Sequence, residues 1–327
     1  MTFWDDQRGA VAVLVAVGIV ALLGMVALSV DVGSMYGTRA DLVNAADASA
    51  LAGAQKLTPS PDLTGAQSTA EAYVAANAGP GADSTVSFSA GNTEITVGIT
   101  KTINLYFAPV LSSDYETADI QAEATAKVGA ANGVPSDWVI PVAVLDDFYY
   151  GNHEDPEIIM DNESETPGNW GPADLDGEHG GGTSDYNPWL EFGYPDAIEC
   201  DPIFTETGFP ASTNECLANR LERSGTFDTC TYDEIAPDFV HEDGTICPRL
   251  VVVPIIDEWP SAQSDPTNIV GFAPFFIENT EDDLYKDNGH HDNQNPMVKG
   301  RFADYSISGG SVGNGPNFGL TAIALIK

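Results

Sequence analysis

The hydrophobic pattern opens with an uninterrupted apolar run from Ala10 to Val30, which is rich in Val, Ala and Leu and contains no charged residue. A helix of about 20 such residues crosses the hydrocarbon layer of a membrane. Arg8 precedes the run, Asp31 ends it, and basic residues are few afterwards. Because cytoplasmic flanks carry the excess of Lys and Arg, residues 1–9 are expected in the cytoplasm and the bulk outside it. A cleavable signal peptide is the alternative, but its apolar region would be shorter, and no clear A-x-A site follows the run before Asp31.

The helical pattern continues beyond the transmembrane run at 10–30. Residues 31–57 contain no proline, and the stretch 45–54 is rich in alanine, the strongest helix former. Small side chains let another backbone approach closely, so this stretch packs either on its own domain or against a second chain. Pro59 ends the helix, and residues 63–78 are expected to form a second, amphipathic helix.

Two later segments change to the alternating pattern of β-strands. Thr93–Ile103 places Val97 and Ile99 on one face, and Ile120–Val128 alternates more weakly. Two helices followed by three or four antiparallel strands predict a small α+β unit over residues 31–130. A long membrane helix that carries a β-rich head is also the arrangement of pilins.

A second, β-rich domain is expected over residues 131–327, after the turn-forming segment Asn132–Pro135. Long segments rich in Gly, Asp and Asn separate its apolar runs of strand length: Trp138–Leu145, Leu250–Ile256, Ile269–Ile277 and Leu320–Ile326. Such strands with long acidic loops predict an antiparallel sandwich or barrel. The fold class is therefore α+β.

The chain is strongly acidic, with 12 Lys and Arg against 49 Asp and Glu and a net charge of −37. This charge repels phosphate backbones and anionic lipid headgroups, which argues against nucleic-acid binding and peripheral membrane binding. Two interpretations stay open: adaptation to a salty medium that screens the charge, or binding of divalent cations.

Several carboxylates in the second domain are candidate ligands for Ca²⁺, which takes 6–8 oxygen ligands. The expected set is Asp146, Asp147, Asp161, Asp174 and Asp176. The D-x-D-G pattern at Asp174 resembles the start of an EF-hand, and Asp185 occupies the twelfth position. However, a glycine run intervenes and no flanking helices are evident, so an EF-hand is disfavoured. Acidic loops that are simply solvated remain the alternative to a Ca²⁺ site, and no other cofactor is expected.

Four cysteines, Cys200, Cys216, Cys230 and Cys247, lie in one loop-rich stretch. None forms a C-x-x-C pair, which argues against a zinc ribbon. In a translocated domain an even number predicts two disulfides with three pairings, of which the sequential pairing closes the shortest loops.

One glycine-rich string, Gly309–Gly313, imitates the nucleophile elbow of hydrolases around Ser311. That mechanism requires an acid and then a histidine after the serine. No His, Asp or Glu follows Ser311. The sequence contains no coherent catalytic constellation, and the protein is not expected to be an enzyme.

The N-terminal residues resemble the Flp pilus-assembly TadE/TadG-like family. Its pattern appears as Arg8-Gly9-Ala10, the apolar run, Asp31-Val32-Gly33 and the block from Asn44 to Ala54 (NAADASALAGA). Parts of the second domain resemble the long-tailed TadG-like members, namely Trp189–Tyr194, Val252–Ile255 and Gly300–Phe302. The resemblance implies a role in building or anchoring tight-adherence pili.

One position departs from the prepilin pattern. Prepilin-type substrates are cut after a glycine and carry Glu at the fifth mature position, but counting from Gly9 the fifth residue is Leu14. The missing carboxylate indicates an anchored TadG-like protein rather than a filament-forming pilin.

The functional expectation is a structural component of pilus assembly, single-pass in the bacterial inner or cytoplasmic membrane. Its expected partners are other pilus or envelope proteins and, through the N-terminal helix, copies of itself. The alternative function is a surface adhesin or a Ca²⁺-stabilised extracellular filament subunit.

Overall fold

The computed structural model of the chain describes residues 7–58, 61–110, 112–155, 157–162, 169–178, 180, 182–223, 230–232, 247–286 and 289–326. The chain divides into two compact units. Unit 1 comprises Met1–Leu57, Asp62–Ala126 and Leu325–Lys327, and unit 2 comprises Thr58–Pro61 and Lys127–Ala324. In sequence, the division after Ala126 and the expected domain boundary after residue 130 both fall within one strand, β3 (Thr117–Val134).

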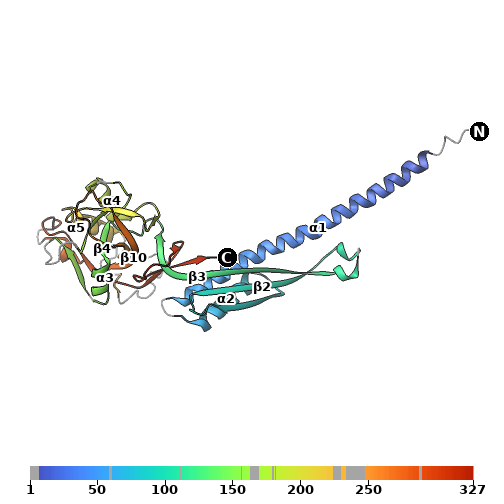
Figure 1. The fold of residues 1–327 in the computed structure, drawn as a ribbon, viewed down its shortest axis with the longest axis horizontal. Helices are drawn as coiled ribbons and strands as arrows, with labels where there is room; N and C mark the ends of the chain where they lie inside the picture. Colours follow the sequence, from blue (N-terminus) through green and yellow to red (C-terminus); the bar gives the residue numbers. More distant parts are fainter. Residues whose placement is uncertain are drawn as a thin grey trace, which may run out of the picture. The chain divides into compact units, whose positions relative to one another are not determined.

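Unit 1 begins with one long helix, α1 (Gln7–Ala54), which continues well beyond the apolar run as expected (Figure 1). A short 3-10 turn, η1 (Gln55–Leu57), follows it. The second helix, α2 (Leu63–Asn77), starts at Asp62, whose side chain accepts a hydrogen bond from the Gly65 backbone N–H at 2.9 Å. This cap satisfies one of the free N–H groups at the helix start, which explains why the helix begins there.

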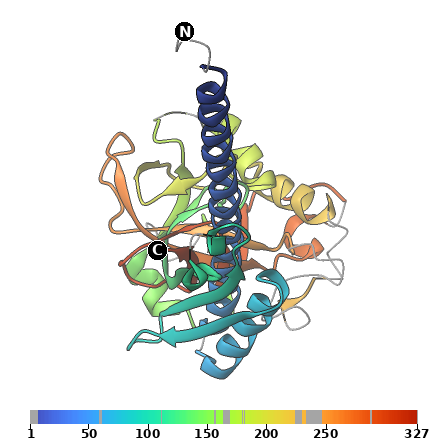
Figure 2. The same cartoon turned by 90° about the vertical axis from the view of Figure 1, so that its right-hand side faces the viewer.

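The sheet of unit 1 is built from β1 (Ala82–Phe88), β2 (Glu94–Asn104) and the first part of β3. β1 and β2 pair in antiparallel fashion, with Ala82 opposite Lys101. The alternation in β2 buries Ile95, Val97 and Ile99. These side chains form the core because α1 packs on both α2 and β2. Figure 2 shows the strands crossing the C-terminal part of α1.

The main sheet of unit 2 has seven strands in the order β5-β11-β10-β8-β6-β4-β9, with a further pairing between β10 and β9. The pairings from β10 through β8, β6, β4 and β9 back to β10 therefore form a closed ring of five strands. The strands are β4 (Val142–Leu145), β5 (Ile158–Asp161), β6 (Trp170–Asp174), β8 (Pro202–Thr205), β9 (Leu250–Ile256), β10 (Thr267–Ile277) and β11 (Met297–Phe302). This arrangement agrees with the expected β-rich domain.

The paired strands β9 and β10 are buried on both faces. Alternate residues of β10 belong to different hydrophobic clusters, with Phe275 in one and Phe272 in the other. β9 alternates in the same way, and all seven of its residues are buried. A continuous apolar run is the pattern of a strand covered on both sides, which explains why the runs at 250–256 and 269–277 appeared in the sequence without polar interruptions.

Helices connect and cover the strands of unit 2, and shorter strands extend a second sheet. The helices are α3 (Asp146–Asn152), α4 (Thr183–Phe192), α5 (Thr213–Arg223) and α7 (Glu281–Leu284). The end of β3 pairs with β7 (Ile198–Glu199) and β13 (Ser311–Val312), and β14 (Leu320–Leu325) lies between β3 and β12 (Tyr305–Ser308). Two strand pairs, β4–β9 and β12–β14, are parallel, which the expectation of an antiparallel domain did not include.

Candidate functional site

The N-terminal half of α1 exposes its apolar side chains. Among the described residues, α1 is the one helix long and apolar enough to cross a membrane by length and composition. Its large hydrophobic side chains between Val11 and Val30 are all exposed. An apolar surface of this extent indicates contact with lipid or with another protein.

The C-terminal half of α1 packs on its own unit. Ala46, Ala50 and Ala54 are completely buried. At Gly53 an added β-carbon would lie 3.1 Å from the Ala66 backbone oxygen of α2. Of the two alternatives for this small-residue stretch, the structure shows packing on the unit's own elements. The buried face of residues 45–54 is therefore covered by α2 and β2, while self-association through the N-terminal helix stays a prediction.

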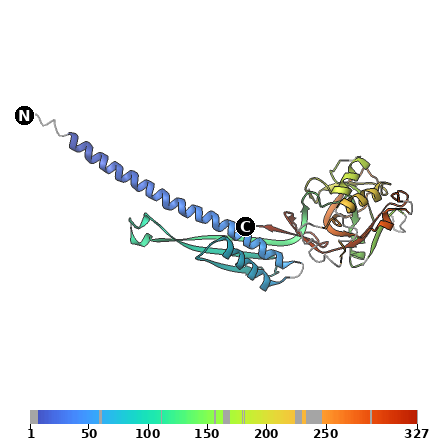
Figure 3. The same ribbon diagram turned by 180° about the vertical axis from the view of Figure 1, so that it is seen from behind.

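A polar junction lies at the end of the apolar run. The Asp31 side chain is only 2% exposed. One of its oxygens accepts from the Tyr106 backbone N–H at 2.8 Å, and the other accepts from Phe107 and Ala108 at 2.9 and 2.7 Å. These three residues belong to the connection between β2 and β3, which reaches alongside the middle of α1 (Figure 3). In the sequence, Asp31 marks the end of the apolar run and belongs to the Asp31-Val32-Gly33 family pattern, but nothing in the local pattern indicated this contact.

The structure brings three carboxylates together in unit 2. One ligand oxygen from each of Asp174, Asp176 and Asp185 lies within 4.8 Å of the others. Asp174 ends β6 and is buried, and its carboxylate accepts from the Gly180 backbone N–H at 3.1 Å. Asp176 accepts from the Glu178 N–H at 2.8 Å. This oxygen-rich group has the ligand chemistry that Ca²⁺ prefers.

The structure around Asp185 differs from the expectation. No flanking helix was expected near this loop, but α4 begins at Thr183 and carries Asp185 in its first turn. The other expected ligands do not belong to this group: Asp146 and Asp147 start α3, and Asp161 ends β5. Calcium binding stays a prediction, now centred on Asp174 and Asp176 with Asp185.

The cysteines form one of the two expected bridges. Cys230 is bonded to Cys247, as the sequential pairing predicts. Cys200 and Cys216 are free thiols in this structure. Cys216 lies in the hydrophobic cluster around α5, whereas Cys200 packs against a different cluster, so the second bridge does not form. Burial raises the pKa of each thiol to about 11, assisted by acidic neighbours.

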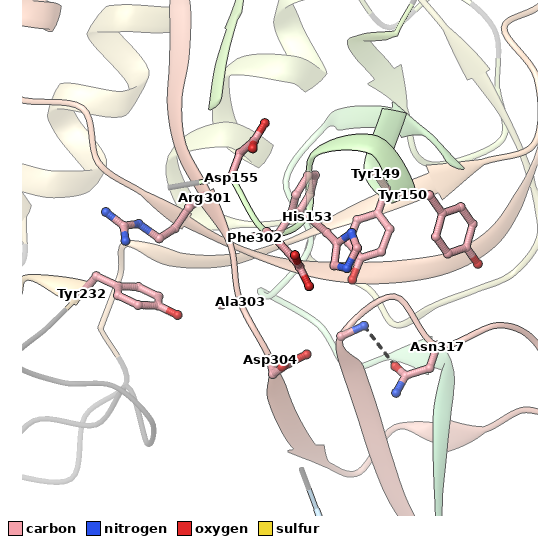
Figure 4. A pocket seen from close by; sticks show the side chains of 12 residues that line it. Tyr149, Tyr150, His153, Asp155, Tyr232, Arg301, Phe302, Ala303, Asp304 and Asn317 are labelled. Carbon is pink, nitrogen blue, oxygen red and sulfur yellow. Dashed lines mark hydrogen bonds between the residues drawn. The ribbon is translucent and has the colours of Figure 1, made fainter. Parts of the chain in front are cut away.

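A pocket in unit 2 has a volume of about 580 Å³. Tyr149 lines it, and its ring centroid lies 4.8 Å from that of Phe302 and 5.3 Å from that of the stacked His153 ring. Figure 4 shows these side chains with Asp304 beside them and Arg301 at the opposite end. Burial and the Asp304 carboxylate raise the pKa of the Tyr149 hydroxyl, which keeps it protonated.

Arg301, at the far end of this pocket, forms an ion pair. Arg301 lies 2.7 Å from the Glu278 carboxylate, and its guanidinium stacks 4.6 Å from the Tyr232 ring centre. Across the pocket, the Asn317 side chain accepts a hydrogen bond from the Gly319 N–H at 3.0 Å. These residues come from segments far apart in the chain, so no motif in the sequence could have indicated the pocket. Two of its polar side chains, Arg301 and Asn317, already have partners within the protein.

Comparison with known proteins identifies the N-terminal part of the chain. No curated protein and no solved structure matches the chain. The resemblance of the second domain to long-tailed TadG-like members lies outside the segment that a family model covers, and it stays a prediction. Residues 9–56, which contain the apolar run, Asp31 and the buried alanine stretch, match the family model "Putative Flp pilus-assembly TadE/G-like", the family that the sequence indicated.

Proposed function

We propose that the protein is a structural component of Flp-type, tight-adherence pilus assembly, held in the inner or cytoplasmic membrane by the N-terminal half of α1. The observation that carries this proposal is the family match over residues 9–56, whose first half is the exposed apolar helix. The same helix is rooted in unit 1 by its buried second half. This connection would hold unit 1 next to the membrane.

Two observations support an extracytoplasmic location for the folded units. Arg8 precedes the apolar run, and positive residues favour the cytoplasmic side of a membrane helix. The Cys230–Cys247 bridge is the second, because disulfides persist in oxidising compartments and are rare in the cytoplasm. The two units then face the envelope space, where their partners would be other pilus or envelope proteins.

The proposal is tested by deletion and fractionation in the producing bacterium. Cells without the protein should lose surface pili, and the full chain should restore them. A chain without residues 10–30 should fail to restore them. The full-length protein should stay in the membrane pellet after alkaline carbonate washing, since about 20 apolar residues in lipid resist release. Normal piliation in the deleted strain would contradict the proposal.

The alternative function, a surface adhesin or filament subunit, predicts that the protein is found in a different cell fraction. Mechanical shearing releases filaments and leaves membrane anchors behind. Under the proposal the protein stays with the cells, whereas a subunit of the fibre would appear in the sheared fraction in amounts comparable with the pilin. The missing Glu at position 14 supports the anchored form.

A further inference from the structure

The connection between β2 and β3 exposes an unusual amount of apolar surface. From Leu105 to Val110 it contains no charged residue. Tyr106 is 71% exposed, Phe107 43% and Val110 84%. Loops at the surface of water-soluble domains normally carry polar side chains, and a contiguous apolar patch marks a contact surface. Something other than water is therefore expected to cover this loop.

The Asp31 carboxylate decides where this loop lies relative to the apolar run. It is the first charged group after Val30, and its oxygens hold the backbone of Tyr106, Phe107 and Ala108 at 2.7–2.9 Å. The loop therefore lies beside α1 at the level where the apolar run ends. If that run crosses the bilayer, as the proposed function requires, this level is the boundary between lipid and water.

The chemistry of the junction fits that boundary. Backbone N–H groups that leave water must be paired within the protein, because lipid offers no acceptor. Asp31 supplies acceptors for three consecutive N–H groups of the loop, and these bonds in turn stabilise its buried charge. Tyrosine, with an apolar ring and a polar hydroxyl, is enriched at membrane interfaces, and Tyr106 is the most exposed aromatic side chain of the loop.

We propose that the β2–β3 loop is a second membrane contact, which inserts Tyr106, Phe107 and Val110 into the interfacial layer of the bilayer beside α1. Asp31 is the positioning residue that ties the loop to the helix. A helix alone allows the attached domain to tilt and rotate about the anchor. Two contacts with the same membrane surface would orient unit 1 relative to it.

Depth measurements on the full-length chain in phosphatidylcholine vesicles test this inference. A nitroxide label is placed on one introduced cysteine at a time, at Leu22 within the apolar run, at Val110 in the loop, or at Ser87, an exposed residue of β1. The chain without an introduced cysteine sets the background of the native thiols. The relative access of oxygen, which partitions into lipid, and of a water-soluble nickel chelate reports depth. We expect the Val110 label to lie between the lipid value at Leu22 and the water value at Ser87.

A matched pair of substitutions tests the role of Asp31. Asp31→Ala removes all three hydrogen bonds of the loop, whereas Asp41→Ala removes an exposed carboxylate from the same helix. The Val110 label should move to the water value in Asp31→Ala and stay unchanged in Asp41→Ala. The Leu22 label should keep its lipid value in both. A Val110 label that stays in lipid after Asp31→Ala would overturn the positioning role.

Different label values would contradict the membrane anchor and the loop contact. A water value at Leu22 would overturn the membrane anchor itself. A lipid value at Leu22 with a water value at Val110 in the unsubstituted background would overturn the inference and leave the anchor intact. Shielding of Val110 from both probes, with broadening between labels on different molecules, would show that a second copy of the chain covers the loop and would also overturn it.

Discussion

Gly53 of α1 and Ile95 of β2 pack so closely that a β-carbon at position 53 would lie 2.5 Å from the Ile95 Cδ1 atom. Ile95 is completely buried, and Ala70 of α2 also lies within 3.2 Å of that position. The helix that carries the membrane segment is thus joined to its β-sheet through a contact that only glycine allows. This closeness explains why small residues occupy the second half of α1.

Two Gly→Ala substitutions in α1 should change stability in opposite directions. Gly37 has no atom within 4 Å of an added β-carbon, so Gly37→Ala should stabilise the helix by about 1 kcal/mol. Gly53→Ala gains the same helix propensity but forces overpacking, which costs about 1–3 kcal/mol. Calorimetry of the full chain in detergent should show a higher Tm for Gly37→Ala and a lower one for Gly53→Ala. Equal shifts in both variants would contradict the close packing.

Thiol counting should find two free cysteines. Alkylation of the denatured, non-reduced chain should add two groups, on Cys200 and Cys216, and reduction beforehand should add four. The double variant Cys230→Ser/Cys247→Ser should lose about 3 kcal/mol of stability, because the bridge closes a loop with a sequence separation of 17. Absence of free thiols in the non-reduced chain would instead support the two-bridge expectation.

The free thiols also predict a dependence on alkaline pH. Burial raises the pKa of Cys200 and Cys216 to about 11 in the folded protein, whereas an unfolded thiol titrates near 8.5. The protonated form is favoured by folding, so its stabilising effect is fully present below about pH 8.5 and is lost as the pH rises through 11. Native alkylation should accordingly stay slow at pH 8 and accelerate towards pH 11. Rapid labelling of the buried Cys216 in the native chain at pH 8 would contradict this prediction.

Calcium should stabilise unit 2 if the three grouped carboxylates bind it. Carboxylates held within 4.8 Å repel one another by about 3 kcal/mol per pair at an effective dielectric constant of 20, and a cation reverses this interaction. With a Kd on the order of 10 μM, 1 mM Ca²⁺ would add about 2.7 kcal/mol. The measurement is the Tm of the chain in Ca²⁺ against chelator at equal ionic strength.

Each control variant for the calcium prediction replaces two Asp by Asn, so all of them change the net charge by the same amount. Asp176→Asn/Asp185→Asn should abolish the rise in Tm, whereas Asp265→Asn/Asp282→Asn, at two exposed positions outside the group, should retain it. The variant Asp146→Asn/Asp147→Asn tests whether the start of α3 also supplies ligands, as the sequence suggested. Loss of the rise in Tm in this variant would add these two residues to the site. Identical melting curves with Ca²⁺ and chelator would leave the acidic loops as solvated surface.

The bond between Gly9 and Ala10 should stay intact in the mature protein. Prepilin-type processing goes with a Glu at the fifth mature position, and Leu14 stands there in this chain. Intact mass and N-terminal sequencing of the membrane-bound protein should show residues before Ala10. The variant Leu14→Glu restores the carboxylate and reports whether the peptidase reaches the site. A native protein that begins at Ala10 would contradict this prediction.

Features that depend on a local pattern of residues could be predicted from the sequence. The length of an apolar run decides whether a helix can cross lipid. Because residues 31–57 contain no proline, α1 could be expected to continue into unit 1, as it does. Continuous apolar runs located β9 and β10, because a strand buried on both faces has no polar side. The expected start of α2 at residue 63 agrees with the structure, in which Asp62 caps the helix.

Contacts between residues far apart in the chain depend on how the elements pack, and the sequence did not indicate them. Asp31 and Phe107 are separated by 76 residues. The hydrogen bond from the Phe107 backbone N–H to the Asp31 carboxylate depends on how the β2–β3 loop packs beside α1. In the same way, α4 carries Asp185 towards Asp174, and separate hydrophobic clusters keep Cys200 from Cys216. Periodicity reports the environment of one element, whereas these contacts depend on packing between elements. That is why the sequence indicated the anchor and the strands but not the junction that joins them.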